Sequence, residues 1–289
     1  MGSPCQIRLY AHSDEFGKSV ISKMIHKLYQ LNDKYTRYHS DSLTSKINAS
    51  AGSDKAIKVD AETEAILNYA QVCYQQSDGL FDITSGVLRK AWNFSNNQLP
   101  EQKKIDRLLS LVGWHKIKWQ PPFILLPKKG MEIDFGGVVK EYAADAVIAI
   151  AQQHEIKHGL IDLGGDIRSI GPLPNGEPWS VHVQHPRNPE KKLVKINLDY
   201  GGISTSGDYE RYMIINGKRY SHIINPKIGW PIKKGYASVT VLADHCVIAG
   251  SATTVAMLKG VDALTWLEEL TLPYWCVDDQ GNVHTNTNA

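Results

Sequence analysis

The sequence lacks the features that mark several common protein classes. Its 289 residues contain no run of about 18 apolar residues, so no transmembrane helix is predicted. No basic and then apolar leader precedes Pro4, so no signal peptide is predicted and the chain as it stands is expected to be cytoplasmic. A chain trimmed of an export leader would read the same way, which leaves a periplasmic or membrane-anchored location open. The net charge of +2 gives no reason to expect nucleic acid or a membrane surface as a partner.

Cysteine is also scarce, and its spacing excludes two kinds of site. Cys5, Cys73, Cys246 and Cys276 form no CxxC pair and no zinc-ligand spacing, so we expect four buried thiols. The chain has no GxGxxG motif either, which argues against a dinucleotide fold of the hydride-transfer kind. No internal repeat and no low-complexity linker divides the chain, so one α+β domain is expected over residues 1–289.

What is present is typical of a globular protein with a sizeable core. Hydrophobic residues make up 42% of the chain and charged residues 21%. The 7 Trp and 13 Tyr suit a planar ligand, and they equally suit plain core packing.

A β-hairpin is the strongest local prediction. Asn216-Gly217 lies between two apolar and aromatic runs and favours a type I′ turn, which would pair Arg211 with His222. The second strand should end at Asn225-Pro226, because proline has no N–H for the ladder. A titratable imidazole is thus expected beside a cation, with a hydroxyl-rich turn at Thr205-Ser206 upstream. His222 is either part of a site or simply satisfies a sheet edge.

A second informative region runs from Met131 to Asp166. Met131–Phe135 and His158–Leu163 read as strands, and Val138–Gln152 between them shows a helical apolar face. This order predicts a βαβ crossover or its split equivalent. Gly136-Gly137 precedes the helix and Gly164-Gly165 follows the second strand. Helix N-termini that follow glycine turns are natural phosphate-binding positions.

Four acidic residues stand in or beside such turns, namely Asp82, Asp134, Asp166 and Asp208. Together with the glycine turns they could converge on one phosphate-rich ligand. The alternative for each is a turn side chain that bonds its own backbone.

Together these segments resemble the ApbE family of FAD:protein FMN transferases over nearly the whole chain. The blocks that carry the resemblance follow one another in order: Met1 to Pro4, Tyr38 to Asn48, Gly79 to Thr84, Asp134 to Gly137, Lys140 to Asp145, Gly164 to Asp166, Thr205 to Tyr209, and His222 to Pro226 with Gly229. The resemblance implies a single α+β domain, related to the T-fold, with mixed sheets, peripheral helices and a central flavin cleft.

The resemblance also implies an activity and a set of site residues. Members of this family take FMN from FAD, release AMP, and attach the FMN through a phosphoester to a Ser or Thr hydroxyl of an acceptor flavoprotein, with Mg²⁺. His222 matches the catalytic histidine. The positions that match the FAD pocket are Met1, Tyr38, Leu80, Phe81, Asp82, Lys140 and Ile224. Asp166, Ser206 and Asp208 fall in family blocks without an assignable role.

The sequence departs from the family at the metal site. The family holds its metal with a main-chain carbonyl where Ala143 stands, a helix Asp, and a Thr that matches Thr254, but here the Asp position is Gly250. A hard cation such as Mg²⁺ prefers anionic oxygen ligands. We hypothesise that Glu141, where the family more often has glycine, supplies the missing carboxylate. The alternative is an ordinary solvent-facing helix glutamate.

The implied chemistry is attack of a hydroxyl on the FMN-side phosphorus of FAD. His222 could accept the hydroxyl proton as general base, and Mg²⁺ would neutralise charge on the diphosphate and the departing AMP. Lys140 and Arg211 could share that electrostatic role. Two other interpretations stay open: a Mg²⁺-dependent FAD pyrophosphatase in which water attacks, and a non-catalytic FAD-binding protein because Gly250 replaces the metal-ligand Asp.

Overall fold

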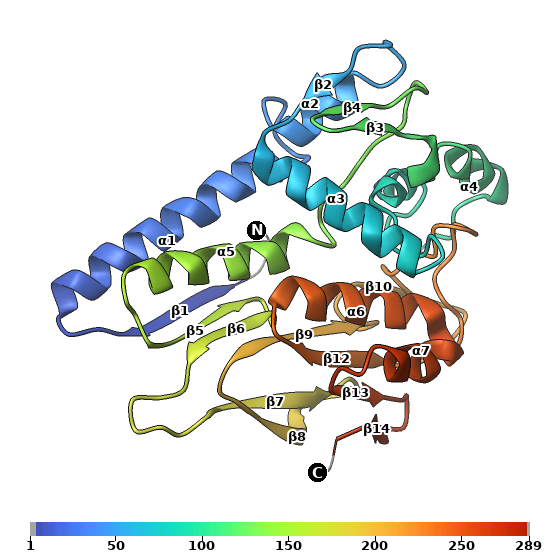
Figure 1. The fold of residues 1–289 in the computed structure, drawn as a ribbon. Coiled ribbons are helices and arrows are strands. Elements are labelled where there is room, and N and C mark those ends of the chain that lie inside the picture. Colours follow the sequence, from blue (N-terminus) through green and yellow to red (C-terminus); the bar gives the residue numbers. More distant parts are fainter. Residues whose placement is uncertain (1–3, 97, 288–289) are drawn as a thin grey trace.

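A seven-stranded antiparallel sheet organises the protein (Figure 1). The computed structural model describes residues 4–96 and 98–287. The strand order across the sheet is β1 (Cys5–Tyr10), β5 (His158–Leu163), β6 (Ile167–Gly171), β9 (Gly201–Gly207), β12 (Ser238–Ala243), β13 (Tyr274–Val277) and β14 (Val283–Thr285). The expected α+β class is confirmed.

Helices cover one face of this sheet (Figure 1). The helices α5 (Val139–Gln153) and α6 (Cys246–Lys259) pack on the strands and against each other, and α1 (Asp14–Tyr35) packs on α5. The short elements η3 (Gly260–Asp262) and α7 (Ala263–Glu269) follow α6. Small buried residues of α5 and α6 allow this close packing of two helices on a sheet.

The opposite face is partly covered by a hairpin of β7 (Trp179–His185) and β8 (Asn188–Leu198). Trp179 and Ile196 of this hairpin share a buried cluster with Ile203 of β9 and Trp275 of β13. The sheet is therefore buried on both faces around β9.

A smaller region lies beyond the helix layer at the top of Figure 1. It contains α2 (Leu43–Ala49), α3 (Ala61–Gln76), η1 (Ile83–Lys90), α4 (Gln102–Leu109), η2 (Trp114–Lys116), and a three-stranded sheet in the order β2 (Ile57–Lys58), β4 (Phe123–Leu125), β3 (Lys118–Gln120). Two helices of this region begin at side-chain caps. The Asp60 side chain accepts a hydrogen bond from Thr63 N at 3.0 Å, and Ser42 Oγ accepts one from Ser45 N at 3.0 Å.

The predicted hairpin is confirmed with its register, but its second strand ends at Ser221 and not at Asn225-Pro226. It consists of β10 (Tyr212–Ile215) and β11 (Lys218–Ser221), and Asn216 and Gly217 have φ of 51° and 74°, as a type I′ turn requires. Beyond β11, His222 N donates to Arg211 O at 2.9 Å.

The prediction of a strand over Met131–Phe135 is wrong, although alternate residues of this segment are buried. Its backbone groups bond elsewhere: Ile133 N donates to Asn48 Oδ1 at 2.7 Å, Asn48 Nδ2 donates to Ile133 O at 3.0 Å, and Asp134 N donates to Ile83 O at 2.8 Å. Because these backbone groups already have partners, they form no hydrogen bonds to a neighbouring strand.

The predicted βαβ crossover is therefore wrong as well. β5 pairs antiparallel with both β1 and β6, and every strand pair in the described residues is antiparallel, where mixed sheets were expected. Thr205-Ser206 belongs to strand β9 and not to a turn. Cys5 is exposed because it lies on edge strand β1, whereas the other three cysteines are buried as expected.

One described segment, Cys246–Glu269, is long and apolar enough to cross a membrane by length and composition alone, and 61% of its most apolar window is buried inside the protein. Its first part is α6, which packs on β9 and β12. Its apolar character is thus that of a core helix.

Candidate active site

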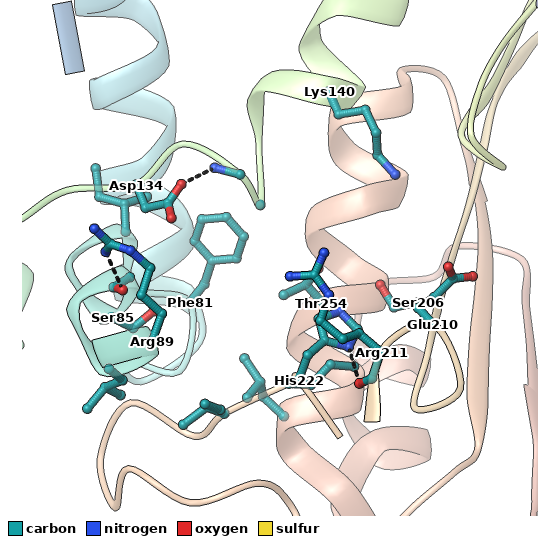
Figure 2. A pocket seen from close by; sticks show the side chains of 18 of the residues that line it. Phe81, Ser85, Arg89, Asp134, Lys140, Ser206, Glu210, Arg211, His222 and Thr254 are labelled. Carbon is teal, nitrogen blue, oxygen red and sulfur yellow. Dashed lines mark hydrogen bonds between the residues drawn. The ribbon is translucent and has the colours of Figure 1, made fainter. Parts of the chain in front are cut away.

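A cleft with a cavity of about 510 Å³ opens between two walls, and this volume falls in the usual range for a small-molecule site (Figure 2). The first wall, here called the η1 wall, carries Phe81, Ser85, Arg89 and Asp134. The second, the hairpin wall, carries Lys140, Ser206, Glu210, Arg211, His222 and Thr254. The cleft thus brings together segments that are far apart in the sequence.

The η1 wall is fixed by Asp82, whose buried carboxylate is fully used. Its Oδ1 accepts hydrogen bonds from Thr84 N at 2.8 Å and Thr84 Oγ1 at 2.6 Å, and its Oδ2 accepts from Trp114 N at 3.1 Å. Gly86 of η1 allows the close approach to Asp134, because a Cβ at Gly86 would lie 2.4 Å from Asp134 Cβ. Asp82 therefore shapes the cleft as a cap of η1.

The start of α5 forms the top of the cleft. Asp134 Oδ1 accepts a hydrogen bond from Gly136 N at 3.0 Å, and Oδ2 pairs with Arg37, so this carboxylate fixes the glycine turn that precedes the helix. In the first turn Lys140 Nζ lies 2.6 Å from Asp166 Oδ2. Burial alone would lower the pKa of Lys140, but the carboxylates of Asp166 and Glu141 outweigh it and raise that pKa. Lys140 is thus a fixed positive charge at the cleft.

Glu141 fills the space that Gly250 leaves open because glycine has no side chain. Its side chain is buried, and a Cβ on Gly250 would lie only 2.4 Å from Glu141 Cγ. Glu141 Oε2 has no hydrogen-bond partner among the described residues. Burial and the nearby Asp166 carboxylate raise the pKa of Glu141. The alternative of a solvent-facing helix glutamate is therefore wrong, since only 7% of the residue is exposed.

His222 lies at the end of the hairpin and faces the cleft (Figure 2). Its Nδ1 is 3.2 Å from Arg211 O. With the proton on Nδ1, the ring donates to that carbonyl and leaves Nε2 as a proton acceptor. Desolvation by the surrounding protein lowers the pKa of His222, and the positive charges of Arg211 and Lys140 add to this lowering. The ring is therefore neutral near pH 7.

Most of the predicted site residues line this cleft. They are Leu80, Phe81, Asp82, Lys140, Glu141, His222, Ile224 and Thr254. Tyr38 does not line it: the residue is 76% exposed, and its hydroxyl accepts from Arg37 Nη2 at 2.8 Å, while Arg37 itself lines the cleft. Ala143 is fully buried in α5 and does not line the cleft. Met1 lies outside the described residues.

Three of the four acids lie at one cleft, and two of them, Asp82 and Asp134, also bond nearby backbone N–H groups as the alternative expected. Asp82, Asp134 and Asp166 line the cleft, together with Ser206. Asp208 does not, because its carboxylate binds Arg187 with Nη1–Oδ1 at 2.5 Å and Nη2–Oδ2 at 2.8 Å on another surface.

Several lining residues were not predicted, namely Arg37, Arg89, Trp92, Phe94 and Glu210. The rings of Trp92 and Phe94 are stacked with centroids 5.8 Å apart. Arg37 precedes Tyr38 and Glu210 precedes Arg211 in the sequence, and these neighbours are the only sequence feature that points to the two residues.

Solved structures share this fold. The ApbE protein of Thermotoga maritima matches with a TM-score of 0.90 at 27% identity, over 98% of this chain and 94% of that chain. The apo form of the flavinyl transferase ApbE of Pseudomonas stutzeri matches with a TM-score of 0.87 at 25% identity, over 99% and 92% of the two chains.

The ApbE family model matches residues 1–275, and the chain therefore belongs to the ApbE family. A relative named FAD:protein FMN transferase in Haemophilus influenzae is 28% identical over 275 residues, covering 91% of this chain and 80% of that protein. A relative of the same name in Treponema pallidum is 27% identical and covers 91% and 82%. The resemblance seen in the sequence is confirmed, and the family is one of enzymes.

Proposed function

We propose that this protein transfers FMN from FAD to a Ser or Thr hydroxyl of an acceptor flavoprotein, forming a phosphoester and releasing AMP. The observation that carries the proposal is His222, with Nδ1 held by a backbone carbonyl and Nε2 available, in a cleft that also contains the glycine-lined start of α5. Membership in the ApbE family and relatives named FAD:protein FMN transferase support it.

The proposed step balances with the groups in the cleft. The acceptor oxygen forms a bond to the FMN-side phosphorus, and the bond from that phosphorus to the bridging oxygen breaks, so that AMP departs with the electron pair. The hydroxyl proton goes to His222 Nε2. Because the imidazole is neutral near pH 7, it can accept this proton without first losing another.

The cleft holds cations for a diphosphate, although its lining also contains five acids, namely Asp82, Asp134, Glu141, Asp166 and Glu210. Lys140, Arg211 and Arg89 line the cavity, and Lys140 is fixed by its 2.6 Å contact with Asp166. Fixed charges stabilise developing negative charge at little cost in reorganisation. We assign these residues to the FAD phosphates and to the departing AMP, and Leu80, Phe81 and Ile224 to the apolar contacts with FAD.

The Mg²⁺ dependence belongs to the same proposal. The described residues contain no group of three or more His, Cys, Asp or Glu side chains that could hold a metal. A site with one carboxylate does fit: Glu141 has a buried oxygen without a partner beside Gly250, and Thr254, one turn further along α6, lines the same cleft. Glu141, Thr254 and the Ala143 carbonyl would hold the ion, which would neutralise phosphate charge when bound.

The metal assignment can be tested without turnover. Calorimetric titration of Mg²⁺ into the protein with FAD should show binding that is lost, or at least about tenfold weaker, in Glu141→Gln. The matched control is Glu64→Gln in the first turn of α3, which should bind Mg²⁺ like the parent protein. Unchanged binding in Glu141→Gln would refute Glu141 as a ligand.

The catalytic assignment is tested with His222→Ala, which should retain FAD binding and lose FMN transfer by about 10²-fold or more. His26→Ala, at an exposed position on α1, is the control and should transfer normally. The products should be followed with and without the acceptor protein. Free FMN and AMP in both cases would instead indicate a pyrophosphatase, and FAD retained without turnover would indicate a binding protein.

A further inference from the structure

A second cavity, of about 950 Å³, adjoins the cleft at Ile223, which lines both. We call it the basic groove. It is bounded by β11 (Lys218–Ser221) and by residues 230–237, whereas His222 and Ile224 face the cleft. A chain lying in this groove would therefore pass within one residue of the proposed base.

The charge of the basic groove is one-sided. Its two acids, Asp208 and Asp279, are both bound by Arg187, at 2.5 to 2.8 Å. The other cations, Lys218, Arg219, Lys233 and Lys234, have no carboxylate within ion-pair distance in the described part of the chain. Arg219 stacks on Tyr212 with its guanidinium carbon 3.8 Å from the ring centroid, and its buried Nη1 has no hydrogen-bond partner. The groove thus presents unneutralised positive charge.

Between these cations the groove is lined by aromatic and apolar side chains, among them Tyr220, Trp230 and Tyr236. Ile228 also lines it and is 49% exposed. A concave surface with apolar positions between cations suits an extended polypeptide that carries acidic residues. A membrane surface, by contrast, requires a convex or flat face that lipid headgroups can reach together.

We propose that the basic groove docks an acidic segment of the acceptor protein and leads its Ser or Thr hydroxyl past Ile223 to His222. This inference rests on the proposed FMN transfer and adds the chemistry of the partner to it. The acceptor hydroxyl must enter the cleft while the rest of its chain stays outside, and the groove, which shares Ile223 with the cleft, is the adjoining surface for that chain.

The test uses Lys233→Glu/Lys234→Glu, which reverses two exposed charges in the groove. Lys191→Glu/Lys192→Glu, at exposed positions of β8, changes the net charge equally and lies outside the groove. The probe is a labelled ten-residue peptide of Asp, Glu and Gly with one central Thr, followed by fluorescence anisotropy with FAD present. A peptide with Lys in place of the acids is the counter-probe.

We expect the groove variant to bind the acidic peptide about tenfold more weakly than the parent at low salt, and the β8 variant to bind within about twofold. FAD affinity should be unchanged in both, and the Lys peptide should not bind. Equal binding of the acidic peptide by the two double variants would overturn the proposal. The proposal would also be overturned if the groove variant lost binding to phosphatidylserine vesicles but kept binding to the acidic peptide, because that result indicates a membrane contact.

The same variants separate the two proposals. If an acceptor flavoprotein receives FMN equally well from both double variants, the groove assignment fails and the transferase assignment stands. If the acidic peptide binds as expected but no protein hydroxyl receives FMN from the parent enzyme, the transferase assignment fails instead.

Discussion

At the scale of single residues, the backbone partner of His222 decides what its ring can do. Arg211 O fixes the Nδ1 side, and desolvation lowers the pKa of the ring below its ordinary value of 6.5. A base of this kind works over a wide neutral range and stops working only in acid, when the imidazole becomes charged.

This gives the first prediction, on the pH dependence of transfer. Protonation of His222 removes the base, so kcat/KM should be flat between about pH 7 and 8 and should fall as the pH drops through a value below 6.5. The measurement is a pH profile of FMN transfer, with FAD affinity measured at each pH as the control. A fall centred above pH 7 would contradict the neutral imidazole described here.

At the scale of elements, the contact between α5 and α6 depends on one glycine. Gly250 lies in the middle of α6, where glycine costs about 1 kcal/mol of helix stability relative to alanine. The compensation is space, because Glu141 Cγ lies only 2.4 Å from the position that a Cβ on Gly250 would take. The two residues form a matched pair across the helices.

The second prediction follows as a double-mutant cycle. Gly250→Ala should destabilise the protein by about 1 to 3 kcal/mol in urea unfolding, because the new methyl group overpacks against Glu141. In a Glu141→Ala background the same change should be neutral or stabilising by up to about 1 kcal/mol, because the clash is gone and the helix gains. Equal effects in the two backgrounds would show that the two side chains do not compete for space.

Elements governed by local signals could be predicted from the sequence. The β10–β11 hairpin and the cap of α3 each depend on residues within a few positions of one another. Met131–Phe135 could not be predicted correctly, because its backbone partner Asn48 is 85 residues from Ile133 in the sequence. An alternating apolar pattern in the sequence is the same whether the backbone hydrogen bonds go to a neighbouring strand or to a distant side chain.

The site divides in the same way. His222 and the glycine turn before α5 carry a local pattern and were found. Arg37 and Arg89 reach the cleft only because α1 and η1 are placed against the 134–137 segment. The hypothesis that Glu141 supplies the carboxylate missing at Gly250 came from the family resemblance, but the steric match between the two residues is a tertiary contact that no spacing predicts.

At the scale of the whole molecule, the cleft lies between two regions that also share buried clusters. Ile83 packs in one core with Val139 and Ala143, and Leu88 packs in another with Met213 of the hairpin. The η1 wall belongs to the small upper region, whereas the hairpin wall is built from residues of α5, β9, α6 and the ends of the β10–β11 hairpin (Figures 1 and 2). A ligand that touches both walls should therefore stabilise the native state, because it binds the folded protein and not the unfolded chain.

The last prediction concerns this coupling. FAD at about 100 times its Kd should add about 2.7 kcal/mol of stability, which corresponds to an increase in Tm of roughly 5 °C for a chain of this size. Riboflavin and AMP, each tested alone in scanning calorimetry at the same concentration as FAD, should give smaller shifts in Tm. Neither carries the complete diphosphate that Lys140 and Arg211 face from the hairpin wall. His222→Ala should keep the FAD shift, since its role is in the proton transfer. An equal shift with riboflavin would mean that the ligand is held by the η1 wall alone, and the diphosphate would then have to lie away from His222.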